Sequence, residues 1–153
     1  MADDFARANE EALAFTHSCS DEQWVLPVPG EDWPVGVVLD HIAESHAHGL
    51  QWVQDMASGR GVLETAEDID RENAAHAVRA QGARRADTAA LLARNGSGLE
   101  EALRRLSDED LDRTSSFGPA GGRLFPTEQL AAVAARHTRE HLAHAQDAVT
   151  AGS

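Results

Sequence analysis

Several residue types are scarce or absent in this chain, and each absence narrows its class. There is no lysine and no tyrosine, and aromatic residues make up 5% of the 153 residues. The single cysteine, Cys19, permits no internal disulfide, which suits a reducing compartment. No apolar run is long enough to cross a bilayer, and the N-terminus lacks the pattern of a signal peptide. We therefore expect a cytoplasmic protein, and we interpret the arginine-only basic set as the codon usage of a GC-rich bacterium.

The residues that are present favour a helical protein with an acidic surface. Hydrophobic residues make up 42% of the chain, and alanine and leucine dominate them. The formal net charge is -13, which repels phosphate backbones and anionic lipids. We therefore expect a small-molecule substrate or thiol as partner, with no nucleic acid and no membrane. A helix face carrying Trp52 and Met56 would support a homodimer if it is exposed, and a monomer remains the alternative.

Apolar residues recur at helical spacing in four long stretches, which predict an all-α protein. The expected helices cover about residues 4–17, 32–59, 67–106 and 127–150. Gly96 and Gly98 fall inside the third stretch, so it is either two helices or one bent rod. A Gly/Pro-rich loop, with room for a brief extended piece, follows at 117–126. Long helices with mid-sized connections favour one domain, 1–153, folded as an antiparallel four-helix bundle.

A histidine pair in the last predicted helix carries the strongest functional signal. His137 and His141 are four residues apart beside an apolar stripe, so both imidazoles lie on one helical face. Two imidazoles on one face can hold a divalent metal ion if a third ligand comes from elsewhere. In a bundle, that ligand would come from a facing helix. The pattern therefore predicts a metal site in the bundle interior.

The third ligand has several candidates on the pattern alone. His46 is centred on the apolar face of the second predicted helix, while His41 lies beside that face and His48 shares its stripe. His144 lies one turn beyond the histidine pair and is either a core residue or a neighbour of the site. Glu140 is either an acceptor for an imidazole N–H or a solvated side chain. Periodicity leaves the choice between His41 and His46 open.

Residues 137–141 also fit His-x-x-Glu-His, the inverted zinc-peptidase signature. Such sites take a further carboxylate ligand from well downstream, and only 12 residues follow His141. The flanking chain is also too short for the mixed α/β fold of those enzymes. We therefore set the peptidase interpretation aside in favour of the bundle site.

Other polar and aromatic residues are predicted to be structural. His17 and His76 have no metal-binding context and are expected to face solvent. Asp70 and Asn73 either cap the third helix, which we favour, or face the site. The three tryptophans, Trp24, Trp33 and Trp52, are expected to serve packing rather than substrate binding. The arginines Arg71, Arg79, Arg84 and Arg85 are expected to form surface ion pairs rather than to bind a thiol's carboxylate.

Four segments in order resemble the DinB-like superfamily of metal-dependent four-helix bundles. Residues 33–43 resemble its tryptophan-to-histidine segment at the start of the second helix, and residues 69–74 the opening of its third helix. Residues 106–111 resemble the turn after that helix. Residues 137–142 resemble its closing two-histidine motif. The four pieces stand at suitable separations and span most of the chain.

The resemblance implies a ligand set and a class of chemistry. One histidine of the second helix and two of the fourth bind a divalent ion in that family, which here implies His41, His137 and His141. The resemblance also implies two candidate activities, since some members are thiol-dependent transferases and others isomerases, using bacillithiol, mycothiol or glutathione. Zinc is the expected ion, and nickel, cobalt or iron would also suit imidazole ligands.

Two functions follow as hypotheses. The first is a thiol S-transferase or isomerase of the mycothiol or bacillithiol type, acting through a three-histidine divalent-metal site with an open coordination position. The second is a non-catalytic bundle that binds metal or a small ligand in a stress response.

Overall fold

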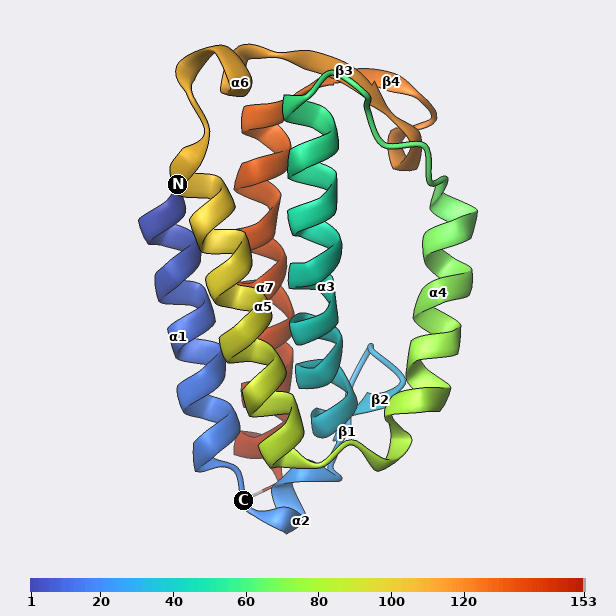
Figure 1. Cartoon of the computed structure of the whole chain (residues 1–153). Helices are drawn as coiled ribbons and strands as arrows, with labels where there is room; N and C mark the ends of the chain where they lie inside the picture. Colours follow the sequence, from blue (N-terminus) through green and yellow to red (C-terminus); the bar gives the residue numbers. More distant parts are fainter. Residues whose placement is uncertain (153) are drawn as a thin grey trace.

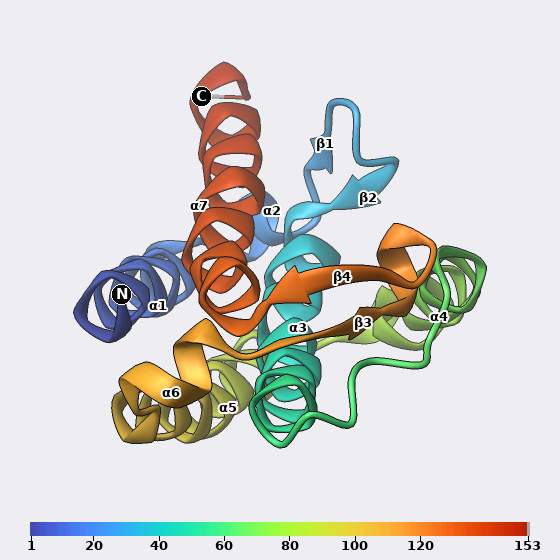
Figure 2. The same cartoon turned by 90° about the horizontal axis from the view of Figure 1, so that it is seen from above.

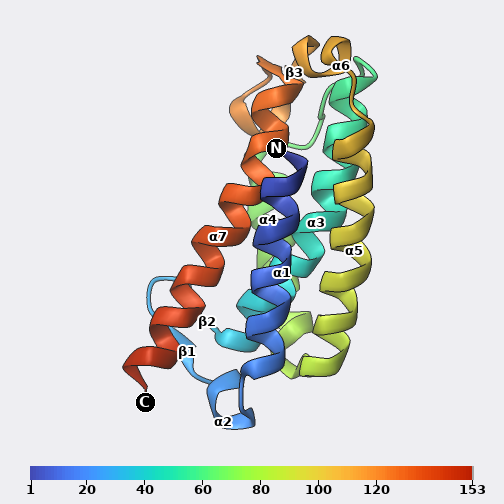
Figure 3. The same ribbon diagram turned by 90° about the vertical axis from the view of Figure 1, so that its left-hand side faces the viewer.

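The computed structural model describes residues 1–152, and its core is a bundle of four long helices (Figure 1). The bundle helices are α1 (Ala2–Ser18), α3 (Val35–Ala57), α5 (Arg85–Arg105) and α7 (Thr127–Ala151). α1 and α7 run in one direction, while α3 and α5 run in the other (Figures 1 and 3). The predicted all-α four-helix bundle is confirmed, with α3 and α5 parallel to each other because α4 returns the chain between them.

The third predicted helix is two helices. α4 (Ala66–Arg79) is followed by the short helix η1 (Ala80–Gly82), and α5 begins only at Arg85. The break therefore falls near Gly82, whereas the sequence drew attention to Gly96 and Gly98. α4 stands outside the bundle and lies beside the α3 side of the molecule, as the view from above shows (Figure 2).

Gly96 has a packing role inside α5 and does not end it. A Cβ atom placed on Gly96 would collide with the side chain of Asn9 on α1. Gly96 leaves the space between the two helices that the Asn9 amide fills. This packing explains why a residue of low helix propensity is kept inside a long helix.

Two short β-hairpins lie at opposite ends of the bundle (Figure 1). β1 (Pro27–Val28) pairs with β2 (Trp33–Pro34), and β3 (Thr114–Phe117) pairs with β4 (Arg123–Pro126). The second bundle helix therefore begins at Val35 rather than at residue 32. The brief extended piece expected near residues 117–126 is the β3–β4 hairpin. Three short helices, α2 (Asp21–Trp24), α6 (Asp108–Asp112) and η2 (Gly118–Ala120), complete the connections.

The apolar face of each bundle helix is buried against its neighbours. Leu39, Ile42 and Leu92 are fully buried in one core cluster together with Cys19, and Leu99 is fully buried in a second cluster. Met56 is also fully buried, so it does not belong to an exposed helix face, and the homodimer stays a prediction. Within the described residues, no helix combines the length and apolarity needed to span a membrane.

Candidate metal centre

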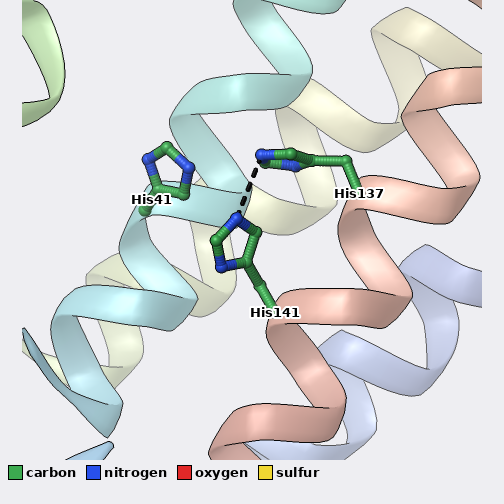
Figure 4. Close-up of side chains that lie close together, drawn as sticks. All are labelled: His41, His137 and His141. Atoms are coloured by element: carbon green, nitrogen blue, oxygen red, sulfur yellow. Dashed lines mark hydrogen bonds between the residues drawn. The ribbon is translucent and has the colours of Figure 1, made fainter. Parts of the chain in front are cut away.

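Three histidine rings converge from α3 and α7 (Figure 4). One ring nitrogen of each of His41, His137 and His141 lies within 4.8 Å of those of the other two. The Nε2 atoms of His137 and His141 are 3.1 Å apart. The four-residue spacing on α7 places these two rings one turn apart, and His41 faces them from the neighbouring helix. The structure thus brings together the three histidines that the family resemblance implied.

All three rings lie at least partly inside the protein, and burial favours the neutral form of His41 and His137. The pKa of His41 is lowered to about 3, first by burial and then by the neighbouring histidines, with His137 the largest of them. The pKa of His137 is lowered to about 4, mainly by burial and then by His141. Both imidazoles are therefore neutral at physiological pH, which is the state that binds a metal ion.

Hydrogen bonds on the far side of two rings fix where their lone pairs point. His141 Nδ1 is 2.9 Å from Glu31 Oε1, so Nδ1 carries the proton and donates it. His137 Nδ1 is 3.5 Å from Ser45 Oγ, whose own hydroxyl donates to the Ile42 carbonyl oxygen. These contacts turn the Nε2 atoms of the two rings toward each other. The 3.1 Å between them suits an N–H···N hydrogen bond in the metal-free protein and a shared metal ion in the loaded protein.

The separation of the two Nε2 atoms also suits a metal ion. Zn–N bonds of about 2.0–2.1 Å at a tetrahedral angle place two ligand nitrogens about 3.3 Å apart. The observed 3.1 Å is close to that value. The donor set, the neutral rings and this spacing together fit a divalent ion with one or more open positions.

Glu31 is a functional residue that the sequence did not reveal. It follows Gly30 in the turn between β1 and β2, and its Oε1 accepts from His141 and also lies 2.6 Å from His144 Nδ1. Burial opposes ionisation of Glu31, but the hydrogen bond from His144 and the contacts with His141 outweigh it and lower the pKa. No periodic pattern could mark a turn residue, because only tertiary folding places the β1–β2 hairpin beside α7.

The other candidate residues have different surroundings. His46 is buried, lies 3.0 Å from Thr138 Oγ1 and packs its ring edge-on against Phe5. His48 is exposed and stacks loosely on Trp52. Glu140 is exposed and pairs with Arg136 on the surface of α7, so it is solvated rather than bonded to an imidazole. His144 is exposed and shares Glu31 with His141.

His17 is exposed as predicted, but the prediction for His76 is wrong. His76 is 2% exposed, because α4 turns it toward α3, where Nδ1 lies 2.9 Å from Glu44 Oε2. Together with Asp40, these residues also form a group with metal-ligand spacing. Arg79 lies 3.3 Å from the same Glu44 oxygen, so a cationic side chain already neutralises that carboxylate.

A pocket of about 820 Å³ opens beside the three histidines, between α3, α4 and α7. Trp33 and Trp52 line it and also pack against core residues, as predicted. Trp24 packs against the core too and donates to the Ala83 carbonyl oxygen. Asn73 also lines the pocket. It therefore faces the site and does not cap α4, which was the role that the sequence favoured.

Thr65 caps α4, and four arginines predicted to lie on the surface form ion pairs. Thr65 caps α4 in a capping box with Asp68, and Asp70 is exposed, so the expectation that Asp70 caps this helix is wrong. The four arginines form ion pairs, as expected. They pair Arg71 with Asp68, Arg79 with Glu44 and Glu72, Arg84 with Asp87, and Arg85 with Asp21.

Comparisons with known proteins agree with the fold and show the family. The sequence model of the DinB superfamily matches residues 4–145, so the chain belongs to this superfamily. A solved structure of YfiT from Bacillus subtilis, described as a probable metal-dependent hydrolase with an unusual four-helix bundle topology, superposes with a TM-score of 0.75. That similarity covers 96% of this chain and 85% of YfiT at 20% sequence identity, and it supports the fold. No curated protein matches the sequence significantly.

We predict that Glu31→Gln weakens metal binding roughly 10- to 100-fold, because the amide is a poorer acceptor for the His141 Nδ1–H and no longer adds negative charge. The affinity can be measured by competition with a chromophoric zinc chelator. Glu140→Gln is the matched control, because it makes the same chemical change at an exposed carboxylate of α7 that pairs with Arg136. Equal affinities for the Glu31 variant and the wild type would contradict the role of Glu31.

Proposed function

We propose that this protein is a metal-dependent enzyme in which His41, His137 and His141 hold a divalent ion beside the pocket. The observation that carries the proposal is the convergence of three imidazoles, with the Nε2 atoms of His137 and His141 3.1 Å apart and His41 facing them. Zinc suits three neutral imidazoles, and nickel, cobalt or iron would fit the same set. Three protein ligands leave a coordination position for a molecule in the pocket.

The chain's own residues supply position and shielding for the reaction. When bound, the ion would lower the pKa of a coordinated thiol or water, so that the nucleophile is available near neutral pH. Glu31 and Ser45 hold the rings of His141 and His137 in fixed orientations. Trp33 and Trp52 form apolar walls that exclude water from the substrate.

For the reaction, we propose thiol-dependent S-transfer or isomerisation with a low-molecular-weight thiol of the mycothiol or bacillithiol type. The only cysteine, Cys19, lies in the core and not in the pocket lining, so the sulfur must come from the cosubstrate. In S-transfer to a chlorinated electrophile, a C–S bond forms, the C–Cl bond breaks and the thiol proton leaves to solvent. The volume of the pocket accommodates a thiol together with a small electrophile.

Metal-dependent hydrolysis is the second candidate, and it is favoured by the likeness to YfiT, which is described as a probable metal-dependent hydrolase. The same site would then activate water instead of a thiol. A non-catalytic bundle that binds metal or a small ligand is the third reading.

The decisive experiment compares the zinc-loaded protein with a chelator-treated, metal-free control. We expect the loaded protein to accelerate consumption of a chlorinated aromatic electrophile by mycothiol or bacillithiol, and the rate to vanish on metal removal and return with zinc. A rate with activated esters in the absence of thiol would favour hydrolysis instead. Metal binding without either rate would support the non-catalytic bundle. No metal uptake would refute both enzymatic candidates and leave only a bundle that binds a small ligand.

A further inference from the structure

The pocket beside the three histidines is a long groove, and those histidines occupy only one end of it. His41 and Trp52 of α3 both line the pocket, and they stand three helical turns apart on one face of the helix. At 1.5 Å of rise per residue, the two positions are separated by about 16 Å. His141 and Leu130 of the antiparallel α7 line the pocket with the same separation. A molecule bound at the three histidines therefore has room to extend toward Trp52.

The far end of this groove combines an indole ring with a carboxylate. Trp52 and Glu64 both line the pocket, and Trp52 Nε1 donates a hydrogen bond to Glu64 Oε2. The Trp52 ring also packs edge-on against Phe117, with the ring centroids 5.6 Å apart. An indole face attracts a positive charge through its quadrupole, and a neighbouring carboxylate attracts the same charge through Coulomb interaction. The pair is therefore suited to an organic cation.

The segment that carries Glu64 is held in place by backbone contacts with β3 and η2. Val62 N–H donates to the Ser116 carbonyl oxygen at 2.9 Å, and Gly118 N–H donates to the Val62 carbonyl oxygen at 2.8 Å. A Cβ atom on Gly118 would collide with the carbonyl oxygen of Glu64, so the two backbones are in direct contact. Because Glu64 and Trp52 are already held together, a ligand that binds them orders few additional groups.

Glu64 is also the lining carboxylate whose charge lacks a cationic or histidine partner among the residues that the structure describes. The other three lining carboxylates each have one: Glu31 contacts His141 and His144, Asp68 pairs with Arg71, and Glu72 pairs with Arg79. The guanidinium of Arg71 also lines the pocket but is already paired. The uncompensated negative charge therefore lies at the end of the groove that holds the indole ring.

We propose that the groove selects an elongated ligand with an ammonium or guanidinium group, which lies on Trp52 beside Glu64 while the reacting group lies at the three histidines. The inference rests on the proposed function only in that the reacting group is placed at the metal centre. It adds the length and the charge of the ligand, which the three histidines do not specify. Trp52 and Glu64 are on this account specificity-determining residues.

The test uses linear thiols of two, six or ten carbons that end in either an amine or a hydroxyl group. Binding to the Co²⁺-loaded protein is measured by calorimetry, and the sulfur-to-cobalt charge-transfer band reports whether the thiol has reached the metal. We expect the ten-carbon amine to bind roughly tenfold more tightly than the ten-carbon alcohol. The two-carbon pair should show no such preference, because a short chain held at the metal does not reach Trp52.

Two variants assign the preference to the far end of the groove. Glu64→Gln removes the charge but keeps an oxygen that accepts from Trp52 Nε1, and Trp52→Leu removes the indole face. We expect each to abolish most of the tenfold preference for the long amine. Glu67→Gln is the matched control, since Glu67 is exposed in the first turn of α4 and is not a lining residue. A preference that is equal in the wild type and Glu64→Gln would overturn the proposal.

A ligand without a thiol keeps this test separate from that of the metal site. The ten-carbon amine and alcohol that lack sulfur are titrated into metal-free protein, where we expect the same Glu64-dependent preference. Absence of a d–d band from added Co²⁺, with this preference intact, would refute the proposed metal site and leave the cation site standing. A normal Co²⁺ band and thiol binding, with equal affinities for amine and alcohol at every length, would refute the cation site alone.

Discussion

Replacing His141 with alanine is expected to remove the bound metal ion. The variant keeps only two of the three converging imidazoles and also loses the ring that Glu31 orients. We expect less than about a tenth of an equivalent of metal per chain in protein purified without an affinity tag, measured by elemental analysis. Its melting temperature should fall below that of the metal-loaded wild type, because an ion bound only to the folded state stabilises that state.

His17→Ala is the matched control for this experiment. His17 is exposed near the end of α1, so its removal takes away an imidazole without touching the site. The control should keep the metal content and melting temperature of the wild type. A His141→Ala protein with unchanged metal content and melting temperature would contradict the assignment of His141 as a ligand.

Leu99→Ala is expected to destabilise the protein by about 2–5 kcal/mol in the free energy of unfolding. Leu99 is fully buried in α5, and its side chain packs against Gly49 of α3, where an added Cβ would lie 3.3 Å from Cδ2. Truncation leaves a cavity where the two helices touch, and close-packed helices cannot collapse to fill it without moving α3. Urea or thermal unfolding of the metal-free protein measures the effect.

Leu63→Ala supplies the same chemical change on the surface. Leu63 is 86% exposed in the segment before α4, so its truncation should change the free energy of unfolding by less than about 0.5 kcal/mol. Similar losses for the two variants would show that the α3–α5 contact does not hold the bundle together as the structure indicates.

The apolar spacing of the sequence was sufficient to predict the bundle, but not where every helix ends. Periodicity marks a buried face wherever one exists, so α1, α3 and α7 lie close to their predicted ranges. Apolar periodicity does not show whether a glycine ends a helix or makes room for a side chain of a neighbouring helix. Gly96 does the second, against Asn9, while the chain turns near Gly82 instead.

The same division applies to the site. The spacing of His137 and His141 places two imidazoles on one face of a helix, and the family resemblance adds His41. The choice between His41 and His46 depends on how α3 is rotated against α7, which periodicity leaves undetermined. In the structure, His41 faces the pair and His46 faces Thr138. The role of His41, His137 and His141 as metal ligands stays a prediction that the experiments above test.

The sequence by itself determined the helical class, the family and the histidine pair, because each depends on residues that are neighbours along one helix or one motif. The tertiary structure alone decided the contacts between distant segments. These are the Glu31 bond to His141, the burial of His76 and the pocket that Trp33 and Trp52 line. Such contacts follow from how a turn and an outlying helix dock on the bundle, and docking depends on the whole packed core rather than on local spacing.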